Sequence, residues 1–322
     1  MLIDFTPLGI HLPGLGLWLD PLSDCETAWV SHGHRDHARG THGCVLGTPE
    51  TLEIYKIRYG EELSPATRFE PLQYGQSFEL RGARLTAYPA GHILGSAQLL
   101  IESNSQRILY TGDIKRLPPL CGALTQVIGC HRLIIESTFG LPIFHFLPRE
   151  EARARMVRFA RECLEQKVAP VFLAHPLGRG QEVLEVLCEA GIPAAVDESI
   201  ARFIPLYEAS GFSFPGWTLH PGAEGARVVA HGFQRVLPAS GRSHRIAYVS
   251  GWAALDNARA RTSAEELIPY SDHAAFEELL ALVRESGAQQ IEVVHGYAEA
   301  FARLLRQAGW RARAPLAGQA GT

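Results

Sequence analysis

The feature that most constrains this chain is the segment 32–37, which reads His-Gly-His-Arg-Asp-His. It places three imidazoles and one carboxylate within six residues. His32 and His34 are two residues apart, so on an extended strand both side chains point to the same face. Gly33 between them lowers strand stability, but it lets the backbone bend or approach another group closely. Asp36 and His37 then lie just past the strand end, on a turn that can curl back.

Imidazole and carboxylate side chains together suit zinc or manganese, and a spacing this tight fits a pair of metal ions. The alternative is a set of surface histidines in a polar loop. Four ligand-type residues in the order His-x-His-x-Asp-His rarely arise by accident, so the pattern favours a metal site.

Three further ligand-type residues follow predicted strands: His92, Asp113 and His295. Each alone is explained as a turn residue, Asp113 especially, because Asp is common in turns. Together they form a consistent set, since active sites in α/β proteins form where strand ends converge. Seven candidate ligands are enough for two metals, with Asp113 as the natural bridge.

The order of predicted elements indicates two α/β lobes. Short apolar runs separated by Gly, Pro and Asp predict strands at 15–21, 27–32, 83–92, 97–103, 106–113 and 132–137. A helical pattern from Glu150 to about Gln166, a strand at 169–175 and a helix at 178–191 then indicate an inserted parallel α/β unit. The chain ends with a strand at 245–251, a helix at 274–287, a strand at 290–296 and a helix at 298–309. We expect the last ~55 residues to return to the first lobe.

Composition limits the cellular setting. The chain has 322 residues, of which 46% are hydrophobic and 20% charged, as in ordinary globular proteins. No apolar run approaches the ~20 residues of a membrane span, and the N-terminus lacks the basic region of a signal peptide. The six cysteines are scattered without a CxxC pair, which predicts free thiols in a reducing cytoplasm. The lack of an apolar span predicts no membrane association. A net charge of −4 still leaves room for a local basic groove.

The histidine motif, followed by a strand-end His, a strand-end Asp and a late His, resembles the signature of the metallo-β-lactamase superfamily. The segments "IIESTFG" (134–140), "PYSDHAAF" (269–276) and "VVHGY" (293–297) resemble the three further motifs of its β-CASP branch, whose nucleases process DNA or RNA. The strings "ESTFGLPIF", "VSGWA", "SDHA" and "HGYAEAFARLL" are most similar to the bacterial ligase-associated DNA exonucleases. The resemblance runs almost end to end.

This resemblance implies a fold and a division of the chain. The fold is α/β, a metallo-β-lactamase αββα sandwich with an inserted α/β β-CASP domain. The first part of the metallo-β-lactamase domain would cover residues 1–148 and the inserted domain residues 149–265. Residues 266–322 would return to the metallo-β-lactamase domain.

The resemblance also implies roles for individual residues. Two divalent metal ions, Zn²⁺ or Mn²⁺, are expected, with ligands His32, His34 and His92 for one, Asp36, His37 and His295 for the other, and Asp113 between them. Asp36, Glu136 and His273 form the expected catalytic set, with His273 as general acid held by Glu136. Alternatively, Glu136 pairs with a surface base, and His273 belongs to the N-cap region of the helix that follows, where Ser271 or Asp272 fits better as the cap.

Two positions depart from the family pattern. The second β-CASP motif usually continues His-Ala-Asp, whereas this chain has His273-Ala274-Ala275, which puts the orientation or protonation of His273 in question. The third motif has His295, as in the RNA-processing branches, while the eukaryotic DNA-repair branch often has Val. The bacterial exonucleases resemble this chain in keeping His.

Contacts with substrate are expected from residues near these motifs. Gly178 and Arg179 open a helix after a strand, so backbone N–H groups there can meet a phosphate; a plain helix start explains them equally well. Lys115 and Arg116 follow the bridging Asp113 and can reach the backbone of a bound strand. Ser271 is the remaining candidate, beside His273.

The predicted activity is metal-dependent hydrolysis of phosphodiester bonds by a hydroxide formed between two metals. DNA is favoured over RNA, with an exonuclease acting on single-stranded ends in DNA repair as the first choice. The alternatives are an RNA-processing β-CASP ribonuclease similar to mRNA 3′-end processing factors, a small-molecule hydrolase and an inactive nucleic-acid-binding scaffold. The subfamily name suggests a functional association with a DNA ligase or helicase. The oligomeric state stays open.

Overall fold

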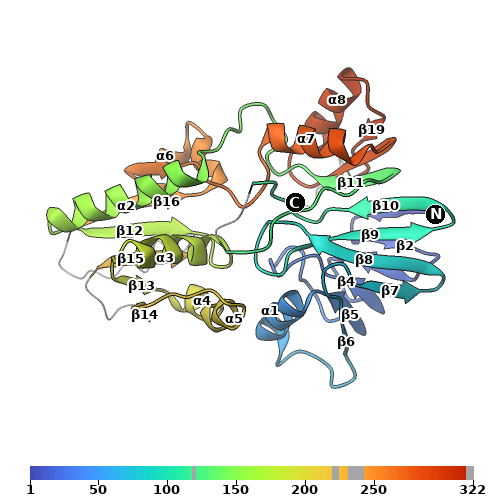
Figure 1. The fold of residues 1–322 in the computed structure, drawn as a ribbon, viewed down its shortest axis with the longest axis horizontal. Coiled ribbons are helices and arrows are strands. Elements are labelled where there is room, and N and C mark those ends of the chain that lie inside the picture. Colours follow the sequence, from blue (N-terminus) through green and yellow to red (C-terminus); the bar gives the residue numbers. More distant parts are fainter. Residues whose placement is uncertain (118–120, 220–224, 231–242, 317–322) are drawn as a thin grey trace. The chain divides into compact units, whose positions relative to one another are not determined.

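The computed structural model describes residues 1–117, 121–219, 225–230 and 243–316 (Figure 1). The chain divides into two compact units, one of Met1–Pro142 with His273–Thr322 and one of Ile143–Asp272. The predicted insertion, residues 149–265, falls within the second of these units and stays a prediction.

The first unit contains two sheets. The first sheet has six strands in chain order: β1 (Asp4–Thr6), β2 (Gly9–Leu12), β3 (Leu17–Leu19), β4 (Thr27–Trp29), β5 (Cys44–Gly47) and β6 (Arg68–Pro71). The second sheet has seven strands in the order β19-β18-β11-β10-β9-β8-β7. These strands are β7 (Ser77–Leu80), β8 (Ala83–Pro89), β9 (Ala97–Ser103), β10 (Gln106–Tyr110), β11 (Arg132–Glu136), β18 (Gln290–Val294) and β19 (Ala312–Arg313).

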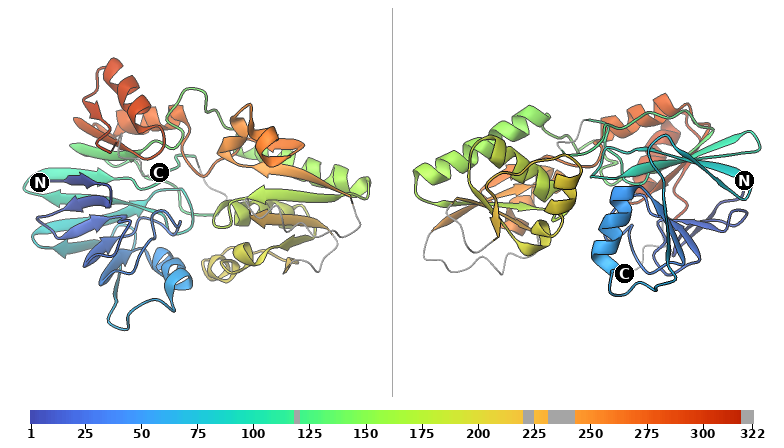
Figure 2. Two further views of the ribbon diagram at one scale, coloured as in Figure 1. Left: turned by 180° about the vertical axis from the view of Figure 1, so that it is seen from behind. Right: turned by 60° about the horizontal axis from the view of Figure 1, so that its bottom comes forward.

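Helices cover the outer face of each sheet. Helix α1 (Pro49–Tyr59) packs Leu52 and Tyr55 against the first sheet, and α7 (Phe276–Ser286) and α8 (Ala298–Gln307) pack against the second. Figures 1 and 2 show α1 in blue and the two late helices in orange to red. The layers are therefore helix, sheet, sheet and helix, which confirms the predicted αββα sandwich.

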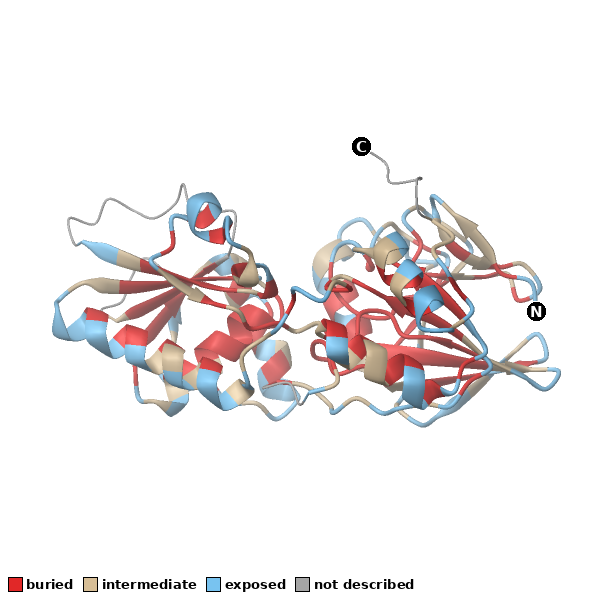
Figure 3. Ribbon diagram, turned by 90° about the horizontal axis from the view of Figure 1, so that it is seen from above, coloured by how far each residue is buried: buried red, intermediate tan, exposed pale blue. Residues whose placement is uncertain are grey.

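Strands β9 and β11 in the middle of the second sheet carry apolar runs without alternation because both of their faces are buried. Leu99 and Ile101 point into the core between the two sheets, whereas Leu100 between them points to the core under α7 and α8. On β10, Ile108 likewise points into the core between the two sheets, and Leu109 points to the core under α7 and α8. Figure 3 shows the buried residues concentrated in the strands of each unit.

The second unit is a doubly covered parallel sheet. Its strand order is β14-β13-β15-β12-β16-β17, and all adjacent pairs run parallel. The strands are β12 (Ala169–Ala174), β13 (Ala194–Val196), β14 (Thr218–Leu219), β15 (Ala226–Ala230), β16 (His244–Val249) and β17 (Glu266–Ile268). The helices are α2 (Arg149–Glu165), α3 (Arg179–Glu189), α4 (Glu198–Ala201), α5 (Ile204–Ala209) and α6 (Ala258–Thr262), with a 3₁₀ turn η2 (Gly251–Ala254). The predicted strand at 169–175 and helices at 150–166 and 178–191 are confirmed.

One sheet edge of the first unit collects the ends of four strands. β8 and β10 both pair antiparallel with β9, and β11 and β18 continue parallel to β10. These four strands therefore run in one direction and end at the same edge. The residues that follow them include His92, Asp113 and His295, and β11 ends in Glu136 itself.

Among the described helices of the chain, none is long and apolar enough to cross a membrane.

Candidate metal centre

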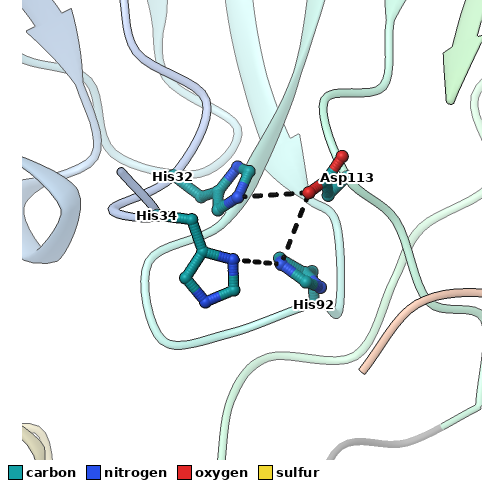
Figure 4. A group of neighbouring side chains, drawn as sticks. All are labelled: His32, His34, His92 and Asp113. Atoms are coloured by element: carbon teal, nitrogen blue, oxygen red, sulfur yellow. Dashed lines mark hydrogen bonds and ion pairs between the residues drawn. The ribbon is translucent and has the colours of Figure 1, made fainter. Parts of the chain in front are cut away.

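Four buried side chains from three different segments meet at this edge. His32 and His34 follow β4, His92 follows β8 and Asp113 follows β10. One potential ligand atom from each lies within 4.8 Å of the others. Figure 4 shows the three rings and the carboxylate turned toward one another. The structure thus brings together four of the seven predicted ligands as one group.

The distances place Asp113 at the centre of the histidines. Its Oδ2 lies 3.4 Å from Nε2 of His32 and 3.7 Å from Nε2 of His92. Nε2 of His92 lies 3.0 Å from Nδ1 of His34. His37 belongs to the second predicted ligand set, and its Nε2 lies 3.3 Å from the same Oδ2 of Asp113. One carboxylate oxygen therefore faces residues of both sets.

The other two residues of the second set lie nearby but are more exposed. The ring of His295 is centred 4.9 Å from that of His37. Asp36 has a side chain 79% exposed, with Oδ2 3.9 Å from Nε2 of His37. The roles of all seven residues as metal ligands stay predictions, and the second set is the looser of the two.

The residues fit a divalent cation by their chemistry. Nε2 of His32 and Oδ1 of Asp113 are both buried without a hydrogen-bond partner among the described residues. Buried polar atoms normally have partners, and imidazole nitrogens and carboxylate oxygens are ligands for zinc and manganese. A cation among these groups would satisfy both atoms.

Charges in the cluster move the pKa values of its members in opposite directions. Burial opposes ionisation of Asp113, but His37, His273 and His32 outweigh burial and hold its pKa well below the ordinary value. Burial also opposes charging of His37, but Asp113 and Asp20 outweigh burial and raise its pKa well above the ordinary value. The carboxylate is thus ready to bind a cation, whereas His37 must lose a proton first.

Asp20 is a candidate functional residue that the sequence did not indicate. It follows β3, and its Oδ2 accepts hydrogen bonds from Oγ of Ser31 at 2.5 Å and Oη of Tyr110 at 2.7 Å, and lies 2.7 Å from Nδ1 of His37. Oδ1 accepts the backbone N–H of Ser31 at 2.7 Å. A buried carboxylate behind a ligating histidine orients the ring and raises its basicity. The available signal was its position at a strand end, which it shares with His92 and Asp113.

The local fold explains why glycine separates His32 and His34. A Cβ on Gly33 would lie 2.3 Å from Cγ2 of Ile54, a buried residue of α1. The carbonyl of Gly33 accepts a hydrogen bond from Nε of Arg58 at 2.8 Å. Helix α1, which sequence analysis did not predict, therefore packs directly on the backbone of the histidine motif.

Glu136 and His273 lie together beside this cluster. Oε1 of Glu136 lies 2.9 Å from Nδ1 of His273 and accepts the backbone N–H of Ile114 at 2.9 Å. Oε2 accepts the backbone N–H of Thr138 at 2.9 Å, so the carboxylate is fully buried and well held. Nδ1 of His273 is 3.9 Å from Oδ2 of Asp113. The alternative of Glu136 paired with a surface base is wrong.

The N-cap of α7 is Ala275, which excludes the alternative that His273, Ser271 or Asp272 caps this helix. The carboxylate of Glu278 accepts the backbone N–H of Ala275 at 2.8 Å. The position where the family usually has Asp is thus a helix cap in this chain, and His273 still lies against Glu136.

The predicted substrate contacts need correction. Lys115 is only 4% exposed, and Nη1 of Arg116 is ion-paired with Oε1 of Glu285 at 2.6 Å. The N–H of Gly178 donates to Oε1 of Gln181 at 2.7 Å, and Ser271 is buried. Arg179 is also buried, between two carboxylates. Burial or an internal partner keeps Lys115, Gly178, Arg179 and Ser271 from a phosphate in this structure. The side chain of Arg116 is 35% exposed, so its contact with substrate stays a prediction.

Comparisons with known proteins agree with this geometry. Residues 260–315 match the family described as "Zn-dependent metallo-hydrolase RNA specificity domain". This chain is 32% identical over 316 residues to a protein of Opitutus terrae named "Probable DNA ligase", covering 94% of this chain and 30% of the relative. It is 30% identical over 234 residues to "Cleavage and polyadenylation specificity factor subunit 3" of Dictyostelium discoideum, covering 63% of this chain and 30% of the relative.

A solved structure shows the same fold. A protein of unknown function from Enterococcus faecalis V583 matches with a TM-score of 0.57 and 15% identity, over 84% of this chain and 75% of that one. The αββα sandwich, the motif order and the sequence matches agree. This chain belongs to the β-CASP nuclease branch of the metallo-β-lactamase superfamily, a group of metal-dependent hydrolases. It spans 30% of the length of the two curated relatives described.

Proposed function

We propose that this protein hydrolyses phosphodiester bonds of nucleic acid, with ends of single-stranded DNA as its first substrate. One observation carries the proposal. Oδ2 of Asp113 lies within 3.7 Å of ring nitrogens of His32, His37 and His92, and the Glu136–His273 pair lies directly beside this cluster. A cation site next to a held imidazole suits cleavage of a phosphodiester, because the cation can activate water and the imidazole can protonate the leaving oxygen.

The metal ligands would divide into two sets. His32, His34 and His92 would hold one divalent cation, Asp36, His37 and His295 a second, and Asp113 both. Bound cations lower the pKa of water and neutralise charge on the phosphate oxygens. Zn²⁺ and Mn²⁺ both suit these ligands.

His273 would protonate the leaving oxygen. Its Nδ1 faces Glu136, so the proton for the leaving group would come from Nε2. The negative carboxylate of Glu136 favours the protonated ring, and two backbone N–H groups keep that carboxylate in place. The products would then be one phosphate-terminated end and one hydroxyl-terminated end.

The choice of DNA over RNA rests on the extent of similarity. The relative named "Probable DNA ligase" aligns with 94% of this chain, whereas the polyadenylation factor aligns with 63%. In that relative, a region like this chain is joined to further sequence in one polypeptide. This supports a functional association with DNA ligation. RNA is the second candidate substrate, because the family matched at residues 260–315 is described by RNA specificity.

The location is also a proposal. None of the six cysteines, all of them among the described residues, forms a disulfide, which agrees with the reducing cytoplasm.

The test is cleavage of end-labelled single-stranded DNA and RNA of the same sequence, with Mn²⁺ and Zn²⁺ supplied separately. His34→Ala removes a predicted ligand, and His42→Ala removes a buried histidine outside the cluster as the matched control. Metal-dependent release of nucleotides from linear DNA, absent in His34→Ala and retained in His42→Ala, supports the proposal. Cleavage of circular single-stranded DNA would instead indicate an endonuclease.

Cleavage of RNA alone would replace DNA by RNA as the substrate. Metal-loaded protein that cleaves neither polymer would contradict the proposed function.

A further inference from the structure

Arg179 is a buried cation in the second unit that the proposed mechanism does not use. Its side chain is only 2% exposed. Nη1 lies 2.5 Å from Oε2 of Glu182, and Nη2 lies 3.0 Å from Oδ1 of Asp272. The guanidinium also lies 4.4 Å from the ring centre of Tyr270. An arginine with two carboxylates and an aromatic ring holds a fixed geometry, because its planar group presents donors in a rigid fork.

The turn that precedes α3 directs this arginine inward. Gly178 has φ +91°, a conformation that favours glycine, and its N–H is bonded to Gln181. A Cβ on Gly180 would lie 3.1 Å from the carbonyl oxygen of His175, so the backbone passes too close for a larger residue without adjustment. Gly178 is therefore the N-cap of α3, and Arg179 begins the helix as a buried residue.

The Arg179–Asp272 ion pair stabilises the segment that leads from β17 to His273. After β17, the N–H of Tyr270 donates to the carbonyl of Ile268 at 2.8 Å, and Tyr270 and Ser271 are buried. Asp272 follows as the last residue of the second unit. The next residue in the chain is His273, the proposed general acid.

The residue after His273 is held as well. The N–H of Ala274 donates to the carbonyl of Ile114 at 2.7 Å. His273 thus has an anchored neighbour on each side, Asp272 through its side chain and Ala274 through its backbone. A residue fixed at both flanking positions loses backbone freedom, and a general acid depends on accurate placement.

We propose that Arg179 is a positioning residue for His273 and acts through Asp272. This inference rests on the proposed function, in which His273 donates a proton to the leaving oxygen. Arg179 transfers no proton and touches no substrate. Arg179 limits the motion of the backbone segment that carries the imidazole of His273. Loss of the Arg179–Asp272 pair therefore impairs protonation of the leaving group more than it impairs the other steps.

The experiment compares two leaving groups at one scissile bond. One oligonucleotide has the ordinary bridging oxygen, and the other has sulfur at the position of the departing atom, as mapped from the wild-type products. Sulfur leaves as a thiolate and needs little protonation. The ratio of the two cleavage rates, measured on one protein sample, is independent of the fraction that is folded. His273→Ala supplies the reference for loss of the acid.

Arg179→Lys and Asp272→Asn should each raise the sulfur-to-oxygen ratio by about tenfold, part of the roughly 10²–10⁴-fold that a general acid contributes. Arg179→Lys keeps the charge but loses the fork that holds two carboxylates. The matched control is Glu182→Gln, which removes the other carboxylate of the same arginine. It should lower the melting temperature and leave the ratio at the wild-type value.

The outcomes separate the two proposals. If wild-type protein cleaves neither oligonucleotide, the proposed function is wrong and this inference falls with it. If wild-type protein cleaves both but His273→Ala leaves the ratio unchanged, His273 is not the general acid, and this inference is wrong while the proposed hydrolysis stands. If His273→Ala raises the ratio while Arg179→Lys and Asp272→Asn do not, only the positioning role is wrong. An equal rise in Glu182→Gln would also overturn it, because the cause would then be general loosening of the unit.

Discussion

Oδ2 of Asp20 lies 2.7 Å from Nδ1 of His37, while Nε2 of the same ring lies 3.3 Å from Oδ2 of Asp113. His37 is thus held between a carboxylate behind it and a carboxylate at the centre of the cluster. The hydroxyl groups of Ser31 and Tyr110 and the N–H of Ser31 hold Asp20 in turn. This arrangement extends the candidate site one layer beyond the residues expected to touch metal.

Replacing Asp20 by Asn should weaken metal binding by roughly 10–100-fold, the usual effect of losing such an outer carboxylate. The amide carries no charge to orient and polarise His37. Competition with a chelator of known affinity measures the change. Asp24→Asn is the control, since Asp24 is an exposed carboxylate that accepts hydrogen bonds from Thr41. Equal affinity in the Asp20 variant and wild type would contradict an orienting role.

Metal binding should release a proton at pH 7. The pKa of His37 is raised above its ordinary value of 6.5, because Asp113 and Asp20 outweigh the opposing effect of burial. In metal-free protein the charged ring stabilises the fold fully below pH 6.5, and this contribution is lost as pH rises through the raised pKa. A metal ligand must be neutral, so metal affinity should increase with pH over the same range.

Titration calorimetry in two buffers with different ionisation enthalpies measures this proton directly. The observed binding enthalpy should differ between the buffers in proportion to the protons released. Identical enthalpies in the two buffers would show that His37 is already neutral before the metal binds.

His92→Asn should abolish tight binding of metal, whereas His42→Asn should retain it. Both histidines are buried, but His92 faces Asp113 and His34, while His42 contacts Cys25. Elemental analysis after gel filtration reports the metal retained per chain. Loss of metal from both variants would indicate that unfolding, and not ligand loss, is the cause.

Glu136→Gln should lower kcat by about 10²-fold or more, with metal content unchanged, because the neutral amide no longer favours the protonated ring of His273. The backbone N–H groups of Ile114 and Thr138 would also lose their charged acceptor. Single-turnover cleavage rates measure the effect. Glu285→Gln, which alters a surface carboxylate paired with Arg116, should stay within twofold of wild type. A normal rate in the Glu136 variant would remove Glu136 from the proposed mechanism.

Gly33→Ala should destabilise the fold by about 1–3 kcal/mol, the typical effect of forcing extra atoms into a packed core. The added methyl would meet Ile54. Ile54→Ala in the same chain opens the space, so the double variant should lose less stability than the sum of the single variants. Denaturant unfolding of the four proteins measures this coupling. Strictly additive losses would mean that the glycine is required for another reason.

Much of the fold was predictable from local pattern. Buried strands such as β9 and β11 are continuous apolar runs, and the helices that cover them have regular apolar spacing. Helix α1 was not predicted, although Thr48 caps it and Pro49 begins it, both ordinary start signals. Its apolar pattern is weak because its buried residues include Thr51 and Tyr55. Packing against the histidine motif, and not local periodicity, accounts for its position.

The predicted substrate contacts, in contrast, could not be judged from local pattern. Arg179 and Lys115 looked available because basic residues are usually exposed, and sequence spacing does not reveal burial. A half-buried carboxylate partner 93 residues away, Asp272, holds the guanidinium of Arg179. Arg116 likewise pairs with Glu285 across the fold. Ion pairs between distant segments depend on tertiary structure alone.

The sequence by itself determined the order of strands and helices and the seven candidate ligands, because strand ends and His-Asp spacing are local properties. The αββα sandwich and the family followed from the resemblance of its motifs to those of known proteins. Only the tertiary structure decided that Asp113 lies between the two sets of histidines, that Glu136 meets His273, and that Asp20 stands behind His37. These relationships join residues up to 137 positions apart. These residues meet because strands that run in one direction end at the same edge of the sheet. Because the residues are buried there, the pKa of each titratable group depends on the charges of its neighbours.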